Sequence, residues 1–126
     1  MRQKREPQLN FSHTMPRTEI GRELQAMSII LDENASILDL VLKELTGSTN
    51  PLIGRNGMSA EQTLRCAILK QYRELTYEEL AFHLEDSAAF RAFARPRHGQ
   101  RFGTSALQDN IKAISETTWE AIMRIL

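Results

Sequence analysis

The segment SAEQTLRCAILKQYRELTYEELAFHL, residues 59–84, decides the fold class. Ser59 and Gln62 have the spacing of a capping box, in which each side chain accepts a backbone N–H at the start of a helix. Apolar residues then recur every three or four positions, as on one face of a helix. Thr76 and Glu79 repeat the capping box further along. The segment therefore predicts two consecutive helices, the first of them central because its apolar face is wide.

Helical periodicity continues on both sides of this segment. The further predicted helices start at Pro16, shortly before Ile37, at Asp86 or Ser87, at a Ser105–Gln108 capping box and at a Thr117–Glu120 capping box. Their expected inward faces carry Ile20, Leu24, Met27 and Leu31; Ile37, Leu38, Val41, Leu42 and Leu45; Ala89, Phe90 and Phe93; Leu107, Ile111 and Ile114; and Trp119, Ile122, Met123 and Leu126. Sustained strand alternation is absent from the sequence. We expect an all-α bundle of about six or seven short helices.

Length and composition exclude several protein classes. The chain has 126 residues, 41% of them hydrophobic and 25% charged, which is typical of one globular domain. The single cysteine, Cys66, excludes an internal disulfide and a zinc site built from several cysteines. No apolar stretch approaches the roughly 20 residues that span a bilayer, and no signal peptide is recognisable. We therefore expect a cytoplasmic protein without membrane contact, with a flexible basic arm at 1–15 and a helical domain at 16–126.

Charge is balanced overall but unevenly distributed along the chain. Lys and Arg number 16, as do Asp and Glu. Residues 23–61 hold two basic and six acidic residues, whereas residues 91–112 hold five basic residues and one acidic residue. A local basic cluster can neutralise phosphates and release their counterions. The 91–112 block therefore indicates nucleic acid as a partner, with an ordinary solvated loop as the alternative.

Two parts of this block are candidates for DNA contact. The helix starting at Thr76 and the one after Ser87 outline a helix-turn-helix pair, whose second helix is expected to present Arg91 and Arg95 opposite Phe93. The alternative is two helices packed in a small bundle. The helix at Ser105 follows a basic loop, and Gln and Asn side chains can read adenine edges while Ser, Thr and Lys hold phosphates. The predicted DNA-binding residues are Arg91, Arg95, Arg97, Arg101, Thr104, Ser105, Gln108 and Lys112, with Asn110 nearby.

Enzymatic signals are poor. His13, His83 and His98 lie far apart, and none has a partner at metal-ligand spacing. Cys66 lies on an apolar helix face, where a reactive thiolate is not expected. Neighbouring acidic residues such as Glu78 and Glu79 point in different directions on a helix and form no acid–base couple. We predict no catalytic residue, no metal site and no cofactor.

Four segments together resemble the N-terminal helical domain of InsH-like DDE insertion-sequence transposases. They are GMSAEQTLR at 57–65, LKQYRELTYEEL at 69–80, DSAAFRAF at 86–93 and SALQDNIK at 105–112. The resemblance covers about residues 50–126, although residues 95–107 depart from the family's pattern. It implies a domain that binds the terminal repeats of the element and helps to assemble the transposase. In that family a ribonuclease-H-like domain with three metal-binding acids follows, so we expect this chain, which stops at Leu126, to be a catalytically incomplete fragment.

Two functions remain open from the sequence. The first is sequence-specific DNA binding by a transposase domain, which the 91–112 charge block favours. The second is a helical module that forms a homodimer or pairs with full-length transposase, which the apolar ending Ile125-Leu126 favours. Trp119 is the expected anchor of the last helix on the core because it is the largest residue of its stripe.

Overall fold

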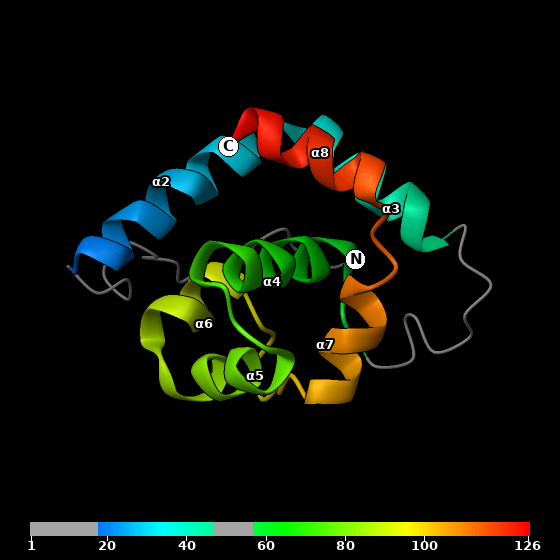
Figure 1. Ribbon diagram of the computed structural model, residues 1–126. Coiled ribbons are helices and arrows are strands. Elements are labelled where there is room, and N and C mark those ends of the chain that lie inside the picture. The colour runs from blue at the N-terminus through cyan, green and yellow to red at the C-terminus, as the bar shows by residue number, and fades with distance from the viewer. Residues whose placement is uncertain (1–17, 47–56) are drawn as a thin grey trace.

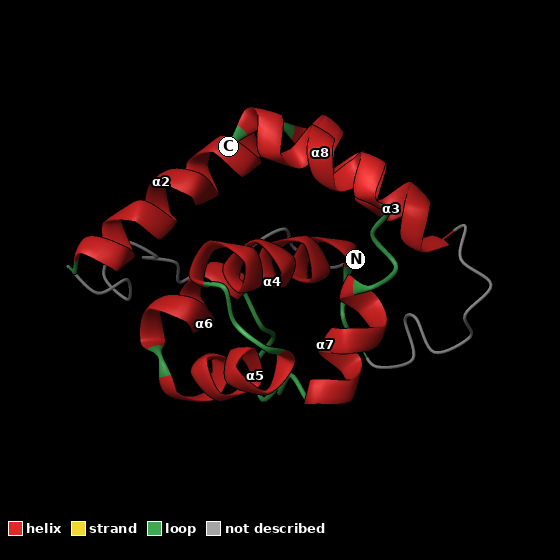
Figure 2. Cartoon of the chain, in the orientation of Figure 1, coloured by secondary structure: helices red, strands yellow, loops and turns green. Residues whose placement is uncertain are grey.

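The computed structural model describes residues 18–46 and 57–126. Within these ranges the chain forms helices and connecting loops but no strand (Figure 2). The helices are α2 (Glu19–Glu33), α3 (Ala35–Thr46), α4 (Ala60–Arg73), α5 (Tyr77–Asp86), α6 (Ala88–Ala94), α7 (Thr104–Ile111) and α8 (Glu116–Ile125). The predicted all-α class is confirmed. The arm at 1–15, Pro16, Gly47 and most of the 48–58 loop lie outside the described residues.

The helices form two layers around α4 (Figure 1). Helices α2, α3 and α8 form an arch on one side of α4, and α5, α6 and α7 lie on the other side. Every residue from Gln62 to Leu69 on α4 is buried. The prediction that this helix is central is confirmed, because α4 contacts both layers.

Side-chain caps fix where most of these helices begin. Both predicted capping boxes of the 59–84 segment are present, at Ser59–Gln62 and at Thr76–Glu79. Thr18 caps α2 through its Oγ1, which accepts the Gly21 N–H at 3.1 Å. Each capped helix start satisfies backbone donors that would otherwise lack a partner within the helix.

Ser87 connects α5 and α6 without any further residue. Its backbone N–H donates to the His83 carbonyl at 2.7 Å, which closes α5, and its Oγ accepts the Phe90 N–H at 3.3 Å, which opens α6. Phe90 and Phe93 then face the core, as predicted from the sequence. A single residue therefore sets the angle between these two helices.

Two other predicted capping boxes are wrong. Helix α7 begins one residue before Ser105, since the extended backbone of Gly103 forms the N-cap, so Ser105 is exposed within the first turn. Helix α8 begins at Glu116, and Ser115 caps it by accepting the Thr118 N–H at 3.2 Å. The Ser115 N–H in turn donates to the Glu44 carboxylate of α3 at 2.7 Å.

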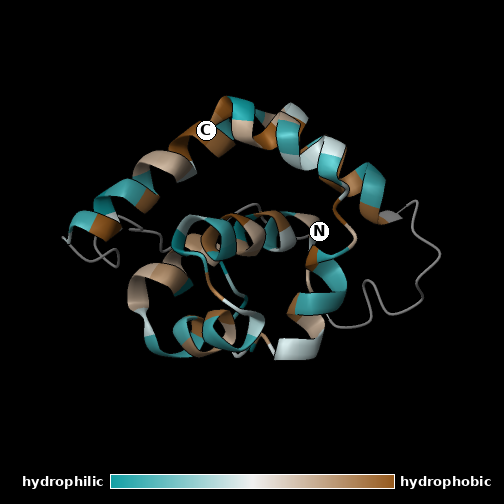
Figure 3. Ribbon diagram, viewed as in Figure 1, coloured by the Kyte–Doolittle hydropathy of each residue, from teal (hydrophilic) through white to brown (hydrophobic). Residues whose placement is uncertain are grey.

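The core lies where the three-to-four-residue spacing places it, with three exceptions. Apolar and polar residues alternate along each helix in Figure 3, as expected for helices that bury one face. Leu42 and Met123, both on expected inward faces, are 48% and 43% exposed, and Tyr72, which continues the apolar spacing of the 59–84 segment, is 37% exposed. Leu42 lies at the edge of the α3 stripe, and the Tyr72 hydroxyl bonds to the Glu23 carboxylate on α2 at the surface.

Helix α8 packs on the core through Ile122, which is fully buried. Trp119 and Leu126 are partly buried against the same core, and Met123 and Ile125 remain exposed. The expected anchor, Trp119, packs on the core, and the fully buried Ile122 packs there beside it. Glu44 of α3 binds the residue that caps α8. Burial would raise the pKa of Glu44, but the hydrogen bonds that its carboxylate accepts from Ser115 and Thr118 outweigh burial and lower that pKa.

Replacing Ile122 by Ala should lower the free energy of unfolding by about 2–4 kcal/mol, because it leaves a cavity under α8. The matched control is Met123→Ala on the same helix, for which we expect a loss below about 1 kcal/mol since its side chain is 43% exposed. Urea unfolding followed by circular dichroism measures both. Equal losses in the two variants would contradict the assignment of Ile122 as the anchor.

Candidate nucleic-acid interface

Helix α7 presents a polar stripe to solvent. Ser105, Gln108 and Lys112 are all exposed, and their i, i+3, i+7 spacing places them on one face. Leu107 and Asn110 point to the opposite side, where both are fully buried. The structure thus brings together three of the predicted DNA-binding residues on a single outward face.

Asn110 does not belong to this stripe. Its side chain is buried, and its Nδ2 donates to the Ala106 carbonyl at 2.8 Å. Its Oδ1 has no hydrogen-bond partner in the structure. A contact between Asn110 and a base edge, suggested by its place in the sequence, is therefore wrong.

The basic loop 95–103 is held to the start of α4 by paired amides. Gln62, which is 2% exposed, donates from Nε2 to the Arg95 carbonyl at 3.0 Å and to Gln100 Oε1 at 2.8 Å. Gln100 donates in turn to the Gly57 carbonyl at 3.0 Å, and its Oε1 accepts the Arg97 N–H at 2.8 Å. These bonds fix the loop backbone, so its basic side chains start from defined positions.

Three arginines of the block lie at the surface. Arg91 on α6 and Arg97 in the loop are exposed, and the Arg97 Nη2 donates to the Gly57 carbonyl at 2.9 Å. The Arg101 side chain is 84% exposed, with its Nε 3.7 Å from Glu85 Oε2. An exposed ion pair of this length contributes little to stability.

Arg95 is directed away from this surface, contrary to the prediction that it lies beside Arg91. Its backbone is in the left-handed region, with φ 59°, because it ends α6. The side chain is 18% exposed and reaches Asp32 Oδ2 at 3.0 Å and Glu61 Oε2 at 2.7 Å. The partly buried carboxylates of Asp32 and Glu61 therefore bind the Arg95 guanidinium, which helical periodicity predicted to face solvent.

The same carboxylates hold Arg65, the largest fully buried side chain described. Its Nε lies 3.1 Å from Glu61 Oε2, and its Nη2 lies 3.3 Å from Asp32 Oδ1. Its Nη1 donates to Ser28 Oγ at 2.9 Å and to the Phe93 carbonyl at 3.1 Å. The guanidinium carbon is 5.0 Å from the centre of the Phe93 ring, a cation–π distance.

Arg65, Arg95, Asp32 and Glu61 form what we term the arginine–carboxylate cluster, which joins α2, α4 and the end of α6. Burial, and then the nearby Arg95, lower the pKa of Arg65 to about 10. Burial would also lower the pKa of Arg95, but its bonds to Asp32 and the nearby carboxylates raise it. Both arginines are therefore charged at neutral pH, and two carboxylates balance them.

The predicted helix-turn-helix pair is tighter than that motif. The motif usually has a turn of three or four residues, whereas α5 and α6 share only Ser87. Helix α6 has seven residues, and Arg91 is its one exposed charged side chain. Of the two candidate elements, α7 therefore offers the wider polar surface.

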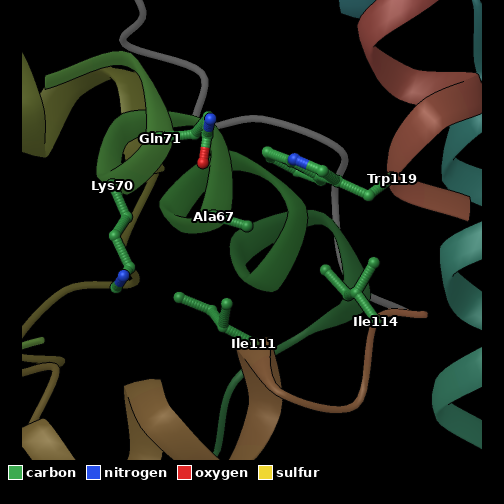
Figure 4. Close-up of a pocket in the computed structure, with 6 residues that line it drawn as sticks. All are labelled: Ala67, Lys70, Gln71, Ile111, Ile114 and Trp119. Atoms are coloured by element: carbon green, nitrogen blue, oxygen red, sulfur yellow. The ribbon is translucent and has the colours of Figure 1, made fainter. Parts of the chain in front are cut away.

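A small pocket lies between α4, α7 and α8 (Figure 4). Its volume is about 190 Å³, below the range typical of ligand sites. The lining residues are Ala67, Lys70, Gln71, Ile111, Ile114 and Trp119. The Lys70 ammonium lies 4.6 Å from the centre of the Tyr77 ring and interacts with that ring.

Other reactive side chains are enclosed or packed. Cys66 is fully buried, and burial raises the pKa of its thiol. His83 packs against the rings of Phe82 and Phe90, with centroid distances of 5.6 and 5.1 Å. Residues 18–46 and 57–126 contain no group of three or more His, Cys, Asp or Glu side chains that could hold a metal ion. In the same part of the chain, no helix is long and apolar enough to cross a membrane.

Comparisons of the chain with family models, curated proteins and solved structures give no match.

The arginine–carboxylate cluster was not predicted, although the sequence carries one sign of it. Arg65 interrupts the apolar face of α4 between Leu64 and Cys66, and Glu61 precedes it by one helical turn. A charged residue at a core position indicates a buried partner. The positions of Asp32 and Arg95 depend on tertiary packing and have no such local sign.

We expect Asp32→Ala to lower the free energy of unfolding by about 2–3 kcal/mol, because it removes charged hydrogen bonds from buried Arg65 and from Arg95. Glu33→Ala provides the control, since Glu33 is an exposed acid next to Asp32 on the same helix. Its effect should stay within about 0.5 kcal/mol. Urea unfolding measures both losses. Equal losses for Asp32→Ala and Glu33→Ala would show that the cluster does not stabilise the fold.

Proposed function

We propose that this chain is a DNA-binding domain that uses the outward face of α7 together with the fixed basic loop that precedes it. The observation that carries the proposal is the exposed stripe of Ser105, Gln108 and Lys112, which follows Arg97 and Arg101 closely in the chain. Phosphate-binding and base-reading side chains are thus proposed to lie on α7 and on the loop directly before it.

The two kinds of side chain have different roles in this proposal. Arg97, Arg101 and Lys112 bind phosphates, which gives affinity for any sequence. Gln108 reads an adenine edge in the major groove with its amide. Thr104 and Ser105 lie in the first turn of α7, where the backbone N–H groups and the helix dipole favour a phosphate. Arg91 adds a further cation from α6.

The resemblance to InsH-like transposase domains gives the proposal its substrate. On this interpretation the DNA is the terminal repeat of an insertion sequence. The catalytic acids of that family belong to a separate ribonuclease-H-like domain, so we propose that this chain binds DNA ends without cleaving them. Incubation with end-containing duplexes and Mg²⁺ or Mn²⁺ should leave the DNA intact.

A second candidate function is dimerisation, or pairing with full-length transposase, through α8. Its support is the exposure of Met123 and Ile125 on the last described helix, at 43% and 36%. If this second candidate holds, replacing both residues by Glu should abolish self-association in sedimentation experiments. DNA binding by the same variant should persist if the two functions use different faces.

The first test of DNA binding replaces Arg97, Arg101 and Lys112 together by Ala. Affinity for every duplex should fall, and the slope of log affinity against log salt should flatten by about 0.9 for each phosphate that the variant no longer neutralises. The control replaces Lys43, Arg73 and Arg124, three exposed cations on other helices. Gel shifts across salt concentrations measure both, and indistinguishable affinities would disprove the proposed surface.

The second test concerns base readout by Gln108. Gln108→Ala should keep affinity for random duplexes but reduce discrimination at one base pair by about 1–3 kcal/mol, since the amide no longer bonds the base. Gln71→Ala, an exposed glutamine on α4, serves as the control. Selection from a random duplex pool measures the preference. A preference that survives Gln108→Ala would show that α7 does not read bases in this way.

A further inference from the structure

The outward face of α5 combines an exposed aromatic ring with acidic side chains. Phe82 is 61% exposed, more than any other large apolar residue in the described ranges. Glu78, Glu79, Glu85 and Asp86 stand three or four positions from it, so they surround the ring on the same face, and all four are exposed. Helix α5 contains no lysine or arginine.

This face is suited to an arginine of another protein chain. A guanidinium can stack on an aromatic ring while it bonds neighbouring carboxylates, and both interactions strengthen when water is excluded. Nucleic acid is the wrong partner for this face, because its phosphates would be repelled by the carboxylates. The Phe82 ring also lies edge-on to the neighbouring His83 ring, with 5.6 Å between the ring centroids.

The complementary arginine is present in the same chain, next to this face. Arg101 Nε lies 3.7 Å from Glu85 Oε2, while 84% of the Arg101 side chain is still exposed. Because the acidic face and its cation adjoin, a two-fold axis near this ion pair would place each copy's Arg101 against the other copy's Phe82 face. Such an interface is self-complementary and closes as a dimer. Net charge does not oppose it, since the chain carries 16 basic and 16 acidic residues.

We propose that a second copy of this chain docks on the Phe82 face of α5 and inserts its Arg101 between the ring and the carboxylates. The interface is distinct from α8, and it shares Arg101 with the proposed DNA surface. Dimer formation and DNA binding therefore compete for this arginine, and a duplex should shift the dimer towards a monomer bound to DNA.

Sedimentation of the whole chain over a range of concentrations, without DNA, tests the proposal. The wild type should form a reversible dimer that weakens with salt. Phe82→Ser and Arg101→Glu should each raise the dimer Kd at least about tenfold, as expected for an anchoring aromatic and its charged partner. Ile29→Ser removes a 52% exposed apolar residue from α2 and should leave Kd unchanged.

A charge exchange separates a direct contact from a general charge effect. Glu85→Arg alone should weaken the dimer, and the double variant Glu85→Arg with Arg101→Glu should bind more tightly than Arg101→Glu alone, because the exchanged charges pair again while the stacking on Phe82 is lost. A wild type that remains monomeric, or a dimer unaffected by Phe82→Ser or by Arg101→Glu, would overturn the proposal. Loss of the dimer only on replacing Met123 and Ile125 would assign self-association to α8 and would also overturn it. Because no DNA is present, these outcomes are independent of the proposed DNA surface.

Discussion

Burial of the Arg65 guanidinium is the constraint on which the arrangement of the helices depends. A charge with 1% of its side chain exposed must be matched nearby, because an unpaired ion in the interior costs several kcal/mol. Asp32 brings α2 to α4 for this purpose, and Glu61 supplies the second carboxylate from within α4. Two carboxylates then require a second cation, which is Arg95 at the end of α6.

The position of the basic loop follows from this cluster. Arg95 is both a member of the cluster and the residue that ends α6, so the loop starts from a fixed point. Gln62, next to Glu61 on α4, holds the Arg95 carbonyl and the Gln100 side chain. The arginine–carboxylate cluster and the candidate nucleic-acid surface are thus connected through Glu61 and Gln62 near the N-terminus of α4. An arginine that looks like part of a DNA-binding loop in the sequence instead positions that loop.

Local signals in the sequence were sufficient to predict the helices but insufficient to predict the arginine–carboxylate cluster. The capping boxes at Ser59 and Thr76 could be predicted because all their partners lie within three residues. The spacing of Ser105 and Gln108 gave the same signal, yet α7 starts one residue earlier, since an extended glycine backbone can also end a loop. The outward stripe of α7 could be predicted from periodicity. The inward turn of Arg95 could not, because it depends on Asp32, which lies 63 positions earlier in the chain.

The double role of Ser87 limits how the length of this chain can vary in evolution. One residue inserted between α5 and α6 would separate the two roles of Ser87, because its N–H closes α5 and its Oγ opens α6 only while no other residue lies between the helices. The closing bond of α5 and the opening cap of α6 could then no longer be made by the same residue. Homologous chains should therefore keep this junction free of insertions and deletions.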